Sequence, residues 1–430
     1  MGGFSAVIVV DGREDGMRSA RPGVAHELCG RPILRWVSEA VRDAGAGWVT
    51  YAVVPGPATG DWPDPGLWAS EVAGLIAGMA DVWGPAPGSG DAGGADAAGA
   101  DGPRVRTVIC GPDALGASGG GGRGVGGADA YAGAAAAAGP WPEAGGGPAV
   151  RVHGDMALLR PETIAGAADA AGPWPEAGGG PAGWAMASGA ESLRARDRVS
   201  LHAAARAMNR RILLGHMRGG VTILDMRGTY VHAGVTIGRD TVIHPGTSLE
   251  GRTSIGVGAV IGPDAKITDT SVGDGAHVRS STVVGGRLGE RCAVGPYAYV
   301  RPGSVIGAQA RIGDFVEVKN STVGDGTSVA HLSYIGDARL GSHVNIGCGV
   351  VTVNFDGKAK HAVEVGDGSF IGCNANLVAP VKVGEGAYVA AGSTIVNEVP
   401  ADALAIARAR QVIKEKRVSA KGMLRDRQIR

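Results

Sequence analysis

Apolar side chains recur every six residues through much of the C-terminal half of this chain. One series runs from Ile237 to Ile267, a second from Leu288 to Val318, and a third from Val365 to Ile395. An α-helix repeats about every 3.6 residues and a lone strand about every two, so neither explains this period. In a hexapeptide repeat, each hexad forms one side of a triangular coil and points one apolar side chain inward. The pattern therefore predicts a parallel β-helix, and coils of this class wind left-handed, against the usual crossover rule.

A polar segment interrupts the repeat. Between Ile346 and Val365 lies the sequence VTVNFDGKAKH, which is rich in residues that favour turns. A loop that leaves an otherwise regular prism is a common place for functional residues. We therefore expect part of a functional site in this segment.

The N-terminal part of the chain predicts a different fold. An apolar run from Ser5 to Val10 precedes a helical pattern near Pro32 to Ala44, and a second apolar run follows from Trp48 to Val54. This order of strand, loop, helix and strand predicts an α/β, Rossmann-like domain. A further helix, from Arg196 to Met217, is expected to link this domain to the repeat.

Low-complexity sequence lies inside the N-terminal part. The segments 84–102 and 116–147 consist mostly of Ala, Gly, Asp and Pro, and cannot bury enough apolar surface to offset the entropy of ordering. The run AAGPWPEAGGGPA occurs at 137–149 and again at 170–182, which indicates a duplicated linker. We therefore expect four parts: an N-terminal domain at 1–195, a linker helix at 196–217, the β-helix at 218–407 and a basic tail at 408–430.

Composition narrows the choice of partners. The chain has 430 residues, with 41 Lys and Arg balanced by 41 Asp and Glu, so no net charge favours nucleic acid or an anionic membrane. Its five cysteines form no CxxC pair, which favours neither a disulfide framework nor a zinc site. No secretion signal and no membrane-spanning apolar run is present in the sequence, so we expect a cytoplasmic protein.

Several long motifs resemble a known family. The C-terminal half contains, in order, VGPYAYVRPGSVIG, FVEVKNSTVGDGTSVAHLSYIGDARLG, VNFDGKAK, IGCNANLVAPVKVGEGAYVAAGSTI and ALAIARARQ. Together these closely resemble the acetyltransferase half of the bacterial bifunctional enzyme N-acetylglucosamine-1-phosphate uridyltransferase / glucosamine-1-phosphate N-acetyltransferase. The resemblance implies a homotrimer that acetylates glucosamine-1-phosphate from acetyl-CoA, on the route to UDP-N-acetylglucosamine and the cell wall.

The resemblance also assigns roles to residues. His331, in AHLSY, corresponds to the general base. The contacts with the sugar phosphate correspond to Arg301, Lys319, Tyr334, Asn345 and Lys360. The contacts with acetyl-CoA correspond to Cys348, Asn354, Phe355, Cys373, Ala391 and Arg408. Phe355 stands where the family usually has Tyr, and Cys373 where it often has Ser, so each position lacks a hydroxyl.

The chemistry requires these residue types. An amine attacks a thioester only as the free base, and histidine, with an ordinary pKa of about 6.5, suits removal of its proton near neutral pH. A phosphate with nearly two negative charges pairs well with one arginine and two lysines. Backbone N–H groups of the coil are expected to stabilise the oxyanion, since Cys373 has no hydroxyl.

Three of the assignments have structural alternatives. His331 would also suit a corner or stacking position in a β-helix. Asn345 would also suit an internal stack of asparagines along the coil. The basic residues from Arg408 onward suit either a solvated tail or the attraction of CoA phosphates.

The N-terminal part follows the family's uridyltransferase signature only in outline. VVDGREDGMRSARPGVAHELCGRPIL has the frame of the nucleotide phosphate loop, but Glu14 and Asp15 stand where the family has Gly and Thr. Gly16 and Gly23 replace the Arg and Lys that would neutralise the phosphates. Asp155, in HGDMALL, keeps the position of a Mg²⁺ ligand. We therefore expect a degenerate, truncated nucleotidyltransferase-like domain with doubtful uridyltransferase activity.

Three other interpretations stay open. A fully bifunctional enzyme would also transfer UMP from UTP to N-acetylglucosamine-1-phosphate. A non-catalytic chain would bind a sugar phosphate or CoA as a regulator. An acetyltransferase could also use a different amine as its acceptor, because this fold serves many acyltransferases.

Overall fold

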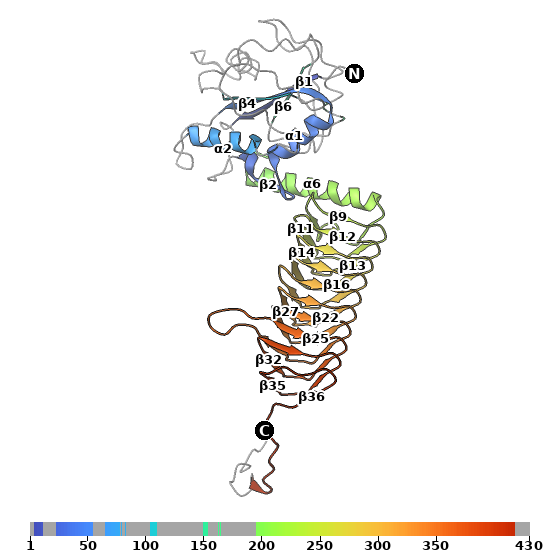
Figure 1. Ribbon diagram of the computed structural model, residues 1–430. Coiled ribbons are helices and arrows are strands. Elements are labelled where there is room, and N and C mark those ends of the chain that lie inside the picture. Colours follow the sequence, from blue (N-terminus) through green and yellow to red (C-terminus); the bar gives the residue numbers. More distant parts are fainter. Residues whose placement is uncertain are drawn as a thin grey trace, which may run out of the picture. The chain divides into compact units, whose positions relative to one another are not determined.

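The computed structural model describes residues 4–11, 23–54, 65–77, 79, 82, 104–109, 149–153, 162, 164 and 195–417 (Figure 1). The chain forms two compact units, Met1–His216 with Tyr230–Gly234, and Met217–Thr229 with Val235–Arg430. Several sequence predictions concern positions outside the described residues, namely the segments 84–102 and 116–147, the loop residues Glu14, Asp15 and Gly16, and Asp155.

The described residues of the first unit include a parallel four-stranded sheet in the order β5–β4–β1–β6. Its strands are β1 (Phe4–Asp11), β4 (Ala46–Val54), β5 (Arg104–Ile109) and β6 (Ala149–His153). Side chains from the helices α1 (Ile33–Asp43) and α2 (Pro65–Ala77) join those of β1 and β4 in one apolar core. The short elements are η2 (Gly23–Ala25), β2 (Glu27–Leu28), β3 (Arg31–Pro32) and β8 (Tyr230–Val231). The predicted α/β character is confirmed.

The predicted linking helix is α6 (Arg198–Arg218). Asp197 caps its first turn, because the carboxylate accepts a hydrogen bond of 2.7 Å from the backbone N–H of Ser200. Ala204 and Met208 are buried against Leu28 and Ile33 of the first unit. The helix is therefore part of an apolar core and not a free spacer.

The second unit is a parallel β-helix with three flat faces, which we call faces I, II and III. From β9 onward the chain visits face III, then I, then II, and each strand pairs in parallel with the strand one coil away (Figure 1). Within residues 195–417, face I has eleven strands. They are β7 (Thr222–Ile223), β10 (Val242–Ile243), β13 (Val260–Ile261), β16 (His277–Val278), β19 (Ala293–Val294), β22 (Arg311–Asp314), β25 (Ser328–His331), β28 (Asn345–Ile346), β31 (Phe370–Ile371), β34 (Tyr388–Val389) and β36 (Leu404–Ala405).

The other two faces have the same construction. Face II contains β11 (Ser248–Glu250), β14 (Lys266–Thr268), β17 (Thr282–Val284), β20 (Tyr299–Val300), β23 (Glu317–Lys319), β26 (Tyr334–Gly336), β29 (Val351–Val353), β32 (Asn376–Val378) and β35 (Thr394–Ile395). Face III contains β9 (Thr236–Ile237), β12 (Ser254–Ile255), β15 (Ser271–Val272), β18 (Arg287–Leu288), β21 (Val305–Ile306), β24 (Thr322–Val323), β27 (Ala338–Leu340), β30 (Val363–Val365) and β33 (Val381–Val383).

The predicted hexad residues form the core of the β-helix. All members of the three series are buried except Ile237, which is partly exposed in the first coil. The six-residue spacing is interrupted between Ile267 and Leu288. The buried residues there are Val272, Val278 and Val283, and most of the sides of the coil that they belong to are one residue shorter than a hexad. The strand register is kept through this interruption. The repeat prediction is confirmed, and burial of one apolar side chain per side is the main source of its stability.

The predicted loop leaves the coil after β29 and returns at β30 (Figure 1, orange). Phe355 and Lys360 form an isolated antiparallel bridge at its base. Asp356 closes the turn, since its carboxylate accepts 2.7 Å hydrogen bonds from the N–H groups of Lys358 and Ala359. The loop is therefore a structured hairpin that holds Lys360 beside face II.

Burial of the hexad residues predicts unequal effects on stability for two side-chain truncations in the β-helix. Leu249→Ala removes a side chain with no exposed surface and should destabilise the unit by about 2–5 kcal/mol. Val396→Ala, at an exposed position, should change stability by less than about 0.5 kcal/mol. Denaturant unfolding followed by circular dichroism measures both, and equal effects would contradict the packing described here.

Candidate active site

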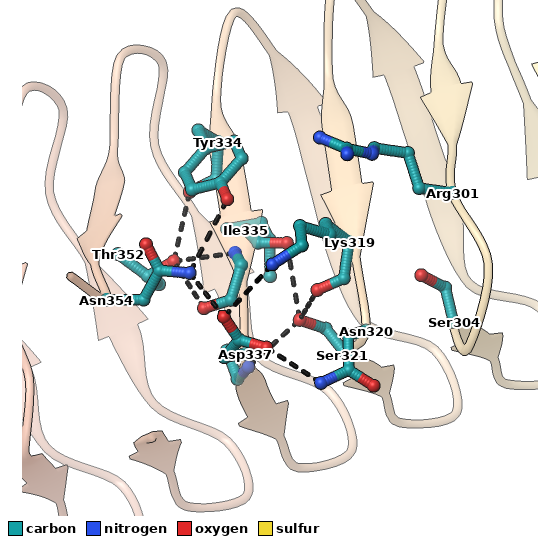
Figure 2. A network of polar contacts seen from close by, with 12 residues as sticks. Arg301, Ser304, Lys319, Asn320, Ser321, Tyr334, Ile335, Asp337, Thr352 and Asn354 are labelled. Atoms are coloured by element: carbon teal, nitrogen blue, oxygen red, sulfur yellow. Dashed lines mark hydrogen bonds and ion pairs between the residues drawn. The ribbon is translucent and has the colours of Figure 1, made fainter. Parts of the chain in front are cut away.

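Three cationic side chains gather on face II. Arg301 follows β20, Lys319 ends β23, and Lys360 comes from the hairpin loop (Figure 2 shows the first two). Arg301 donates a 2.8 Å hydrogen bond to Glu317, which fixes the guanidinium over the face. A hydrogen bond with Lys319 and the charges of Lys319 and Arg301 lower the pKa of Lys360. Two carboxylates, Glu317 and Asp337, pair with Arg301 and Lys319, so the cluster keeps a net positive charge that suits an anion such as a phosphate ester.

A carboxylate below these cations links several of the neighbouring side chains. Asp337 lies at the corner after β26, with φ of 48°. Its Oδ2 is 3.4 Å from Lys319 Nζ and accepts a hydrogen bond of 2.5 Å from Asn354, and its Oδ1 accepts one of 2.7 Å from Asn320 (Figure 2). Burial acts to raise the pKa of Asp337, but the hydrogen bonds from Asn320 and Asn354 and the charge of Lys319 outweigh it, so the pKa is lowered. Asp337 thus holds one expected sugar-phosphate contact and one expected acetyl-CoA contact together.

Tyr334 lies beside this network, and two residues of the same face, Gly336 and Thr352, leave space for its side chain. A side chain at Gly336 would collide with the Tyr334 ring. Thr352 occupies a core position where most coils have Ile, Leu or Val, and its hydroxyl accepts a 2.7 Å hydrogen bond from the backbone N–H of Gly336. Asn354 Nδ2 is 3.5 Å from the Tyr334 hydroxyl (Figure 2). A glycine and a buried hydroxyl therefore make room for the tyrosine.

His331 forms a pair with Asp314. The two residues end β25 and β22 and are direct partners in the parallel ladder of face I. His331 Nδ1 is 2.5 Å from Asp314 Oδ1, and this hydrogen bond is the main cause of a lowered pKa of Asp314. A carboxylate at Nδ1 favours the tautomer with the proton on Nδ1, which leaves Nε2 free to accept a proton. The His331 side chain remains half exposed, so its ring can be reached from solvent.

The corner between faces I and II carries a column of in-register residues. We call this column the I–II edge, and its members come from five consecutive coils: Asp314, His331, Cys348, Cys373 and Ala391. The expected base and three of the expected acetyl-CoA contacts thus fall on one line. Arg408 lies one coil further, near Gly392.

Some expected contacts lie apart from this group. Asn345 is exposed on face I, where its ladder partners are Ser328 and Phe370. The alternative of an internal asparagine stack is therefore wrong, because the side chain points outward and has no asparagine neighbour in the ladder. Phe355 is exposed on the hairpin. Among the residues that the structure describes, no group of three or more His, Cys, Asp or Glu side chains is placed to hold a metal ion.

Comparisons with known proteins agree with the motifs. The model of the bacterial transferase hexapeptide family (six repeats) matches residues 362–397. The bifunctional protein GlmU of Brevibacillus brevis is 55% identical over 224 residues, which are 52% of this chain and 49% of that protein. GlmU of Clostridioides difficile is 52% identical over 230 residues, 54% of this chain and 50% of that protein. The predicted resemblance to this bifunctional family is confirmed over about half of the chain.

The matches to GlmU are partial: the chain spans about half the length of the curated GlmU relatives it matches. Solved structures also align with parts of it. A mutant of GDP-perosamine N-acetyl transferase from Caulobacter crescentus, in complex with CoA and GDP-perosamine, is 26% identical over 27% of this chain and 52% of that chain, with a TM-score of 0.24. LpxA from Acinetobacter baumannii is 17% identical over 41% of this chain and 70% of that chain, with a TM-score of 0.26.

The Asp337 network predicts a pH-dependent contribution to stability. The lowered pKa means that the carboxylate stabilises the fold above its unfolded pKa, about 3.9, and that this contribution is lost as pH falls below it. Asp337→Asn should therefore lower the unfolding midpoint at about pH 6, and the difference from wild type should shrink toward about pH 3. Denaturant unfolding across this range measures it, with Glu364→Gln, on the exposed side of face III, as the control. A difference independent of pH would contradict the charge-based account.

Proposed function

We propose that the β-helix is an acetyl-CoA-dependent glucosamine-1-phosphate N-acetyltransferase. The observation that carries this proposal is the hydrogen-bonded pair of His331 and Asp314. His331 lies in the same coil as Tyr334, whose strand β26 borders Lys319 of β23 on face II. The pair supplies a base, and Arg301, Lys319 and Lys360 supply positive charge for a phosphate. The identity to GlmU proteins supports the choice of acceptor and acetyl donor.

The residues suggest a direct transfer. His331 Nε2 takes a proton from the substrate amine as its nitrogen forms the new bond to the acetyl carbon. The carbon–sulfur bond breaks, and the CoA thiolate receives the proton from the imidazolium, so protons and electrons balance. Asp314 stabilises the imidazolium between these steps, and backbone N–H groups of the coil stabilise the oxyanion.

We also propose that the enzyme is a homotrimer with active sites between neighbouring prisms. Tyr297, Phe315 and Leu332 are exposed apolar residues at successive corners beside the I–II edge, and the first two rings stack at 5.5 Å. Such a stripe suits contact with a second copy of the chain, and a cyclic trimer closes that contact. A cytoplasmic location is part of the same proposal. Within the described ranges, no helix has the length and apolar character of a membrane span.

For the N-terminal part we propose a nucleotidyltransferase-like domain at 1–195 that has lost its activity. Support comes from the sequence, since Glu14 and Asp15 place negative charge where a triphosphate would bind. Mg²⁺ binding at Asp155 belongs to the alternative in which the chain is fully bifunctional. The linker helix (196–217), the acetyltransferase domain (218–407) and the basic tail (408–430) complete the proposed organisation.

The acetyltransferase proposal predicts a ranked loss of activity. His331→Ala should lower the turnover of glucosamine-1-phosphate by about 10²- to 10⁴-fold, because it removes the base. Asp314→Ala should cause a smaller loss, since Nε2 is kept but its tautomer and orientation are not fixed. Free CoA release measures both, with His277→Ala, an exposed position of β16 on face I, as the control. If His331→Ala retains more than about half of the wild-type rate, the assignment of the base is wrong. If the wild-type chain acetylates no amino sugar phosphate, the result contradicts the enzyme and favours the non-catalytic regulator.

The degenerate phosphate loop predicts the absence of the second activity. The full chain with UTP, N-acetylglucosamine-1-phosphate and Mg²⁺ should form no pyrophosphate above a control without protein, because two carboxylates replace neutral residues and two cations are missing. Glu14→Gly combined with Asp15→Thr tests whether the charge alone is responsible. Formation of UDP-N-acetylglucosamine by the wild-type chain would restore the bifunctional interpretation.

A further inference from the structure

Two cysteines of the I–II edge differ from the others that the structure describes. Cys29 and Cys292 are buried, and burial raises the pKa of their thiols, to about 11 for Cys29 and about 12 for Cys292. Cys348 is half-buried, and Cys373 is exposed. All four are free thiols. Among the four cysteines that the structure describes, only the edge pair therefore combines access to solvent with a second thiol in the neighbouring coil.

The strand register places these two thiols opposite each other. β28 and β31 pair in parallel with Ile346 opposite Ile371, which puts Cys348 opposite Cys373 two residues later. The N–H of Asn374 donates a 2.8 Å hydrogen bond to the carbonyl of Cys348, so the pairing continues through the corner. Neighbouring parallel strands are about 4.8 Å apart, inside the range of about 4.4–6.8 Å over which disulfides join Cα atoms.

Side chains at this position of the edge reach one another. Asp314 and His331 occupy the same place two coils earlier, with the same hydrogen bond pattern, in which the N–H of Leu332 donates to the carbonyl of Asp314. Their side chains are hydrogen-bonded at 2.5 Å. Each cysteine is followed by a residue with positive φ, Gly349 at 75° and Asn374 at 55°, so the two corners have similar backbone conformations. Both thiols therefore project to the same side of the prism.

We propose that Cys348 and Cys373 form a reactive dithiol that exchanges with low-molecular-weight disulfides and closes to a disulfide between adjacent coils. The exposed Cys373 thiolate attacks one sulfur of the small disulfide and releases the first small thiolate. Cys348 then attacks the Cys373 sulfur of the mixed disulfide and releases the second. Two protein thiols are oxidised, one small disulfide is reduced to two thiols, and the protons pass from the cysteines to the released thiolates.

The closed form should be inactive in acetyl transfer. This consequence rests on the proposed function, in which acetyl-CoA contacts both positions next to His331 on the edge. A disulfide brings the two sulfur atoms to about 2.05 Å and fixes both side chains, which changes the surface that the thioester would contact. Reduction would restore the open form, so the loss should be reversible.

The test exposes the full-length chain to glutathione disulfide, alkylates the remaining free thiols with N-ethylmaleimide, and maps the peptides by mass spectrometry. Wild type should show a peptide pair joined through Cys348 and Cys373 with the loss of two hydrogens, and Cys292 should be alkylated only after unfolding. Cys348→Ala should accumulate a glutathione adduct on Cys373, because the resolving thiol is missing. In Cys373→Ala, adduct formation should be slower, because the remaining thiol is half-buried.

Activity is followed in the same samples. Treated wild type should lose most of its acetyl transfer and regain it with dithiothreitol. A stable adduct on wild-type Cys373 without a cross-link to Cys348 would overturn the dithiol proposal, as would two thiols that stay free. A cross-link that forms in a chain with no acetyltransferase activity before treatment would contradict the proposed function and leave the dithiol standing.

Discussion

The in-register stacking of parallel coils is the constraint on which the C-terminal unit depends. Each strand pairs with the strand one coil away, so a residue at one place in a coil has a fixed neighbour above and below. The register keeps one apolar side chain per side in the core, even where a side is one residue shorter. It also builds columns of side chains on the surface, and the candidate active site is made from two of them.

This arrangement explains how side chains on the surface of the prism are held in a defined geometry. The I–II edge brings Asp314 to His331 because the two residues are ladder partners. Gly313 permits this approach, since a side chain there would collide with the carbonyl of Ala330. On face II, Lys319 and Asp337 meet across neighbouring coils in the same way, and the hairpin adds Asn354 and Lys360. A rigid ladder thus orients polar groups that are themselves partly exposed.

The sequence predicted the β-helix well because its signal is local and repeated: Ile243, Leu249 and Ile261 are spaced as each side requires and are buried. The elements of the first unit were predicted to within a few residues for the same reason, as α1 and β4 show. The partners within the site were not predicted. The partners of Asp314, Asp337 and Thr352 lie about one coil away in the sequence. Because the sides of the coils vary in length, the sequence alone does not show which residues are opposite each other. The alternative of an asparagine stack at Asn345 is wrong for this reason, because its ladder neighbours are Ser328 and Phe370.

The central claim is that face II and the I–II edge together bind a sugar phosphate and acetyl-CoA for transfer to an amine. A crystal structure of the full chain with glucosamine-1-phosphate and CoA tests it most directly. The account predicts the phosphate against Arg301, Lys319 and Lys360, and the amine nitrogen within about 2.6–3.2 Å of His331 Nε2, with the CoA sulfur beside Cys348 and Cys373. A sugar phosphate bound away from face II, or an amine that does not approach His331, would contradict it.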